Sequence, residues 1–120
     1  MALVYSRNPL SGSTNGRPIE VAATGSLGTT LHTVQATATD AREEVHLYAV
    51  NRSTASAPLT IELGGTATTD QILTFLPSQA GFDLVIPGIS FTATTSIIRA
   101  FTTGTATDAI TIAGWVNRAT

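Results

Sequence analysis

The chain has 120 residues, a net charge of −2 at pH 7, no cysteine and no lysine. A chain of this length forms one domain with one hydrophobic core. The lack of cysteine excludes disulfides, thiolate nucleophiles and cysteine-ligated metals. Because no cluster of cations is present, we expect no binding to nucleic acid. We also expect neither a signal peptide nor a membrane-spanning segment, since no apolar run is long enough.

The first 26 residues predict an N-terminal arm or linker. Residues 6–18 read "SRNPLSGSTNGRP", a stretch rich in Ser, Gly, Asn and Pro with almost nothing to bury. Within it, Asn15 and Gly16 are typical of a tight turn. The domain itself is therefore expected over residues 27–120.

From residue 27 onward, short runs of alternating apolar and polar residues predict β-strands. Threonine is the commonest residue, with 22 copies, and its β-branched side chain suits a pleated surface. The runs are "LGTTLHTVQA", "REEVHLYAVN", "LTIELGG", "DQILTFLP", "FDLVIPG", "TSIIRAFT" and "AITIAGWVN". Turn residues between them predict an all-β, antiparallel β-sandwich, jelly-roll-like or Greek key, with an extended N-terminal arm. We expect a core that contains Val45, Leu47, Ile61, Leu63, Leu84, Ile86, Ile110 and Ile112.

Four predicted connections between strands have distinctive sequences. The pentapeptide "TATDA" occurs at residues 37–41 and 105–109, and each copy precedes a run that ends in "VNR". We expect each copy to close a hairpin, whether the repeat reflects duplication or a Thr/Ala-rich composition. The segment "IPGI", from Ile86 to Ile89, predicts a type II turn at a corner between the sheets. The polar segment "ELGGTATTDQ" is expected to close a further hairpin.

Catalytic and metal-binding patterns are lacking, so we expect a protein that is not an enzyme and has no cofactor. His32 and His46 are the only histidines, and each is expected on a partly exposed strand face. Two histidines without cysteine are too few for a zinc site. Glu43 and Glu44 are interpreted as solvated charges that open a strand. Asn51 begins a short glycosylation sequon, and Tyr48 with Trp115 could form either a sugar-binding platform or a core or subunit contact.

The order of several blocks resembles small structural proteins of tailed bacteriophages. The blocks are "TLHTVQ", "EEVHLYAVN", "LTIELGG", "GFDLVIPG", "IIRAF" and "ITIAGWVNR", within residues 27–118. In size and β content the chain is most similar to capsid decoration (cement) proteins. The resemblance implies a virion protein, made in the bacterial host cytoplasm, that sits on the capsid surface and bridges major capsid subunits. Another virion position (neck, tail or fibre attachment) and a carbohydrate-binding module are the alternatives.

The same resemblance implies how the protein assembles. Decoration proteins commonly sit at symmetry axes of the shell, so we expect a homotrimer with uncharged Thr/Ala faces at its contacts. Leu3, Val4 and Tyr5 are expected to add a strand to the sheet edge of a neighbouring subunit. Arg7 and Arg17 would then pair with carboxylates of the capsid. The alternative is an arm folded back on its own domain.

Overall fold

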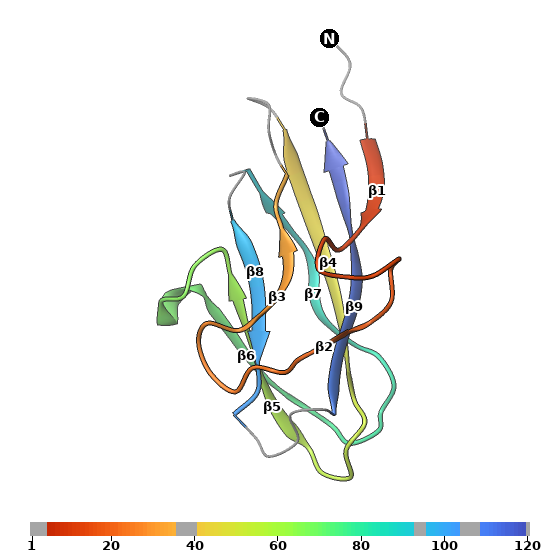
Figure 1. The fold of residues 1–120 in the computed structure, drawn as a ribbon, viewed down its shortest axis with the longest axis vertical. Coiled ribbons are helices and arrows are strands. Elements are labelled where there is room, and N and C mark those ends of the chain that lie inside the picture. Colours follow the sequence, from red (N-terminus) through yellow and green to blue (C-terminus); the bar gives the residue numbers. More distant parts are fainter. Residues whose placement is uncertain (1–4, 36–40, 93–95, 104–108, 120) are drawn as a thin grey trace.

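In a computed structural model of the chain, two antiparallel sheets pack face to face as a β-sandwich (Figure 1). The structure describes residues 5–35, 41–92, 96–103 and 109–119. Sheet A has the order β1-β9-β4-β7, with β2 also beside β9, and sheet B has the order β3-β8-β5-β6. The strands are β1 (Tyr5–Pro9), β2 (Ile19–Glu20), β3 (Thr29–Thr33), β4 (Arg42–Asn51), β5 (Ala57–Leu63), β6 (Gln71–Leu76), β7 (Asp83–Phe91), β8 (Ile97–Phe101) and β9 (Ile110–Ala119).

A single turn of 3₁₀-helix, η1 (Thr68–Asp70), lies between β5 and β6. These two strands pair as the expected hairpin. No helix within the described ranges is long and apolar enough to cross a membrane.

The all-β prediction is confirmed, and a strand forms in each of the seven predicted runs. Alternation with a period of two places one face of each strand toward the core between the sheets. Six of the eight expected core residues are fully buried: Val45, Leu47, Ile61, Ile86, Ile110 and Ile112. Leu63 is partly buried against the same core, but Leu84 is 53% exposed.

Leu84 faces outward because β7 is irregular. Ile86 lies opposite Leu47 and Leu84 lies opposite Tyr48, so Val85 is an extra residue in the ladder. An inserted residue of this kind is a β-bulge, and it reverses the alternation on its far side. The prediction of Leu84 in the core was therefore wrong.

A second irregularity in β7 explains the "IPGI" segment. Pro87 pairs with His46 and Ile89 with Val45, so Gly88 is left over at a second bulge. Gly88 has a φ of 106°, a conformation that favours glycine. The segment lies inside a strand, so the expected corner turn was wrong; Pro87 is tolerated because β7 is an edge strand.

Neither "TATDA" copy joins a hairpin. β3 and β8 belong to sheet B, whereas β4 and β9, which follow the two copies, belong to sheet A. Both connections therefore cross between the sheets, and the strands on either side pair with other partners; most residues of the pentapeptides themselves lie outside the described residues. The two "VNR" copies also differ, since Asn51 is buried and Asn117 only half-buried. The two copies of the "VNR" motif therefore lie in different structural environments.

The N-terminal segment is part of the sandwich. β1 pairs with the end of β9 and β2 with its beginning. Between these strands, Leu10 is 1% exposed, and Val21, just after β2, is fully buried. Both belong to the core cluster. Residues 5–26 thus differ from the expected arm, because two isolated apolar side chains anchor a segment that is otherwise polar.

Hydrogen bonds also attach the N-terminal segment to β3 of sheet B. The Gly12 amide donates to the Leu31 carbonyl of β3 (2.9 Å), and the Thr33 amide donates to Ser11 Oγ (2.7 Å). The Asn15–Gly16 turn is confirmed, with φ values of 54° and 82°. The segment therefore leaves sheet A, contacts sheet B and returns, which closes this side of the sandwich.

Replacing Leu10 with alanine tests whether this segment belongs to the core. The change should lower the free energy of unfolding by about 2–5 kcal/mol, because a buried leucine leaves a cavity. Urea denaturation would measure it. Leu27→Ala is the matched control: Leu27 is 62% exposed, so its change should stay within about 0.5 kcal/mol. A Leu10→Ala protein as stable as the parent would mean that the segment is a separate arm.

Candidate binding surface

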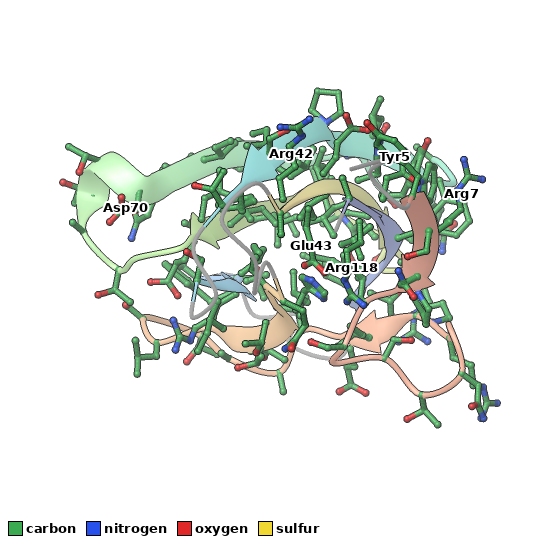
Figure 2. All side chains as sticks on the ribbon, turned by 90° about the horizontal axis from the view of Figure 1, so that it is seen from above. Tyr5, Arg7, Arg42, Glu43, Asp70 and Arg118 are labelled. Carbon is green, nitrogen blue, oxygen red and sulfur yellow. The ribbon has the colours of Figure 1, made fainter. Side chains whose placement is uncertain are left out.

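A buried carboxylate connects the two sheets. Glu43 of β4 is fully buried, with His32 Nε2 2.6 Å from one oxygen and Arg118 Nε 2.6 Å from the other. These partners lie on β3 and β9. Figure 2 shows Glu43 and Arg118 together in the interior, between the layers. The expectation of a solvated Glu43 was wrong, because its partners replace the lost water.

His32 extends this chain to the N-terminal segment. Its ring is 1% exposed, and its Nδ1 accepts a hydrogen bond from the Ser11 amide (2.9 Å). An accepting Nδ1 places the proton on Nε2, which donates to Glu43. The prediction of a partly exposed His32 was therefore wrong. With both ring nitrogens engaged and no access to solvent, this histidine has a structural role.

Hydrogen bonding determines the ionisation of Glu43. Burial alone raises the pKa of this carboxyl, but hydrogen bonds from His32, Arg118 and the Gln35 backbone outweigh it. The net pKa lies below the ordinary value of 4.5. Glu43 is thus held as a carboxylate, and its charge is neutralised by Arg118.

His46 forms a second acid–histidine pair, on the outer face of sheet A. Its Nε2 lies 2.6 Å from Glu44 Oε1, and Asn117 Nδ2 donates to the same oxygen at 3.3 Å. These two hydrogen bonds lower the pKa of Glu44. Its side chain is 45% exposed, as expected for a solvated charge. Within the described residues, no three His, Cys, Asp or Glu side chains cluster as a metal site would require.

Aromatic side chains gather beside this pair. His46 stacks on Trp115 with the ring centroids 4.8 Å apart, and Tyr48 stacks on Trp115 at 5.6 Å. Phe82 meets Tyr48 edge-on at 6.1 Å. The Arg7 guanidinium carbon lies 5.2 Å from the Trp115 ring centroid, within range of a cation–π contact. Trp115 is thus a surface residue of sheet A, with its Nε1 buried and without a hydrogen-bond partner.

Next to the aromatic residues lies a shallow hollow of about 410 Å³, which we call the arginine hollow. β1, β4, β7 and β9 each contribute to its wall, and its lining residues are Tyr5, Ser6, Arg7, Arg42, Glu44, Ser90, Asn117 and Ala119. Figure 2 shows Tyr5, Arg7 and Arg42 on the side of the molecule that sheet A forms. Arg7 Nε donates to Asn117 Oδ1 (3.5 Å), and no described carboxylate forms a salt bridge with Arg42. The two guanidinium groups outnumber the one carboxylate of the lining, that of Glu44, so the hollow has a net positive charge that suits carboxylates.

The residues that the sequence predicts as partner contacts do not all line one hollow. Tyr5 and Arg7 line the arginine hollow, whereas Arg17 borders a different hollow beside Thr14 and Ile19. Leu3 and Val4 lie outside the described residues. Sequence reasoning missed Arg42, which the register of β4 on β9 brings beside Ala119.

The glycosylation sequon does not present an acceptor. Asn51 is 1% exposed, and its Nδ2 donates to the carbonyls of Ala55 and Leu76. Its Oδ1 accepts from the Ser53 amide and hydroxyl. The Asn51 side chain therefore stabilises the turn after β4 and is not available as a glycosylation acceptor.

No protein-family model matches the chain, and neither a curated protein nor a solved structure matches it.

The buried carboxylate gives a pH dependence with a defined sign. Because the pKa of Glu43 is lowered on folding, the unfolded chain binds this proton first as the pH falls. The stabilisation is complete above about pH 4.5 and is lost as the pH falls through the lower, folded-state pKa. Glu43→Gln should cost about 1–3 kcal/mol at neutral pH, and this difference should shrink in acid.

Urea titrations between neutral pH and strong acid would measure the effect. Glu20→Gln is the control, because Glu20 is exposed on β2, and it should follow the parent at every pH. A difference between Glu43→Gln and the parent that does not change with pH would contradict the assignment.

Proposed function

We propose that the chain is a capsid decoration protein of a tailed bacteriophage, located on the capsid surface of the virion and assembled in the host cytoplasm. The resemblance of its strand blocks to such proteins supports this role. The arginine hollow supports it further, because it offers a contact surface rather than a catalytic arrangement. The jelly-roll-like or Greek-key connectivity of the strands belongs to the same proposal.

The proposed mechanism is linkage. A protein that binds the assembled lattice but not free subunits stabilises the lattice by mass action. Tyr5, Arg7 and Arg42 would contact carboxylates of the major capsid protein, and each copy would bridge neighbouring subunits. Leu3, Val4 and Arg17 are further proposed contacts. Neck, tail or fibre attachment is the alternative position in the virion.

Substitution of the arginine pair tests the proposal. Arg7→Ala and Arg42→Ala should each weaken binding to undecorated capsids about ten-fold or more, since a charge-assisted hydrogen bond contributes about 1.5–3 kcal/mol. Co-sedimentation with bare shells would measure it. Arg99→Ala is the control, because Arg99 lies on β8 of the other sheet. If a variant with both Arg7→Ala and Arg42→Ala binds bare capsids as tightly as the parent, the arginine hollow is not the contact surface.

The proposed assembly is a homotrimer. Light scattering at tens of micromolar should give three times the mass of the 12.4 kDa chain, or a multiple of that mass where trimers associate further. A threefold arrangement matches the local axes of an icosahedral shell. A monomer at this concentration would contradict a stable trimer.

Carbohydrate binding is a second candidate, carried by one observation. An apolar hollow of about 350 Å³ is lined by Tyr48, Phe82 and Trp115, with Gly16, Ala113 and Gly114. Aromatic walls of this kind suit the apolar face of a sugar ring. A glycan array, with Tyr48→Ala as the control, would test carbohydrate binding. Saturable binding that the variant loses would support it, and the absence of binding would exclude it.

A further inference from the structure

The four lateral edges of the sandwich are protected unequally. An unprotected edge strand exposes unpaired backbone groups and pairs readily with another chain. β3 is covered by Ser11 and Gly12, β7 carries Pro87 and two bulges, and β1 carries Arg7 and Pro9. Among the described strands, only the edge of β6 lacks a charge, a proline, a bulge and a cover.

The same edge exposes large apolar side chains. Leu73 and Phe75 of β6 are each 72% exposed, and Leu84 at the start of β7 is 53% exposed. β6 and the start of β7 border one groove of about 370 Å³. In Figure 2 both strands lie on the side opposite β3 and the N-terminal segment. Exposed apolar side chains next to an open backbone edge are typical of a protein contact.

We infer that β6 pairs with β6 of a second copy of this chain, antiparallel about a twofold axis, so that two copies of sheet B become one continuous sheet. A twofold contact requires only one self-complementary patch. The twofold axis also joins the outer face of sheet B in one copy to the outer face of sheet B in the second copy.

The alternation of β6 defines the register. Leu73 and Phe75 face outward, since each is 72% exposed, while Thr74 between them pairs with the buried Leu59. Residues directly opposite each other must share a face. The register with Thr74 opposite Thr74 of the second copy satisfies this and places Leu73 opposite Phe75 of the second copy, twice.

Neighbouring registers are poorer. A shift of two residues in one direction places Leu73 opposite Pro77 of the second copy, and in the other direction Phe75 opposite Gln71. Only in the central register do both exposed apolar residues face apolar partners that lie within β6, because Pro77 follows the strand and has no backbone N–H to pair.

The absence of charge along β6 is also compatible with a second copy at this edge. No charged residue lies between Asp70 and Asp83. In the central register Asp70 lies beyond the paired strand, opposite Ser78 of the second copy, so the two Asp70 carboxylates are at opposite ends of the contact. No like charges therefore face each other.

This contact goes beyond the proposed function and is independent of it. A twofold pair through β6 uses neither the arginine hollow nor a threefold axis. Failure of capsid binding would leave the pairing intact, and failure of the pairing would leave capsid binding intact.

Thr74→Cys tests the register in the full-length chain. The chain has no other cysteine, and facing Cα atoms in an antiparallel pair lie about 4.5–5.5 Å apart, within the range of a disulfide. Under mild oxidation the variant should form a disulfide-linked dimer, seen on a non-reducing gel. Thr14→Cys is the matched control, since Thr14 is an exposed threonine on the N-terminal segment. It should cross-link at least ten-fold more slowly.

A second pair of variants tests the apolar contact. Adding Leu73→Lys to Thr74→Cys should reduce cross-linking at least ten-fold, whereas adding Leu27→Lys should not change it. Leu27 is similarly exposed but lies away from β6, and circular dichroism melts of all variants verify the fold. Cross-linking of Thr74→Cys no faster than Thr14→Cys, or unaffected by Leu73→Lys, would overturn the inference.

Discussion

The buried carboxylate of Glu43 is the interaction on which the rest of the arrangement depends. It joins β4 to β9 through Arg118 and to β3 of the other sheet through His32. His32 in turn receives the Ser11 amide. An unpaired buried charge is strongly destabilising. Arg118 and His32 must therefore be in place around Glu43, and the Ser11 amide must be in place beside His32. One side chain thus specifies how the sheets and the N-terminal segment meet.

The consequence is a sandwich with one closed and one open side. Leu10 and Val21 bury themselves where the N-terminal segment crosses between sheets. On the opposite side, β6 and β7 have no such cover within the described residues, and Leu73 and Phe75 face solvent. The closed side adds Leu10 and Val21 to the core that both sheets share. The open side and the arginine hollow are the two surfaces that we propose as contacts with partners.

The sequence predicted the seven later strands because their alternation is local. It could not predict what depends on contacts distant in the chain. Glu43 looked like a surface charge, since neither Arg118 nor His32 is near it in sequence. Leu84 pointed outward because of bulges that only the pairing with β4 creates. The sequence singled out Tyr5 and Arg7 as expected contacts, which stays a prediction. Arg42 lines the same hollow through the register of β4 on β9, which the sequence did not reveal.

Amide hydrogen exchange on the full chain tests the central claim most directly, namely that residues 5–12 are an integral part of the sandwich. The account predicts that the amides of Gly12 and Thr33, whose hydrogen bonds close this side, are protected from exchange nearly as well as those of β4. If instead the amides of residues 5–12 exchange at the rate of an unfolded chain while β4 stays protected, the segment is an arm and the account is wrong.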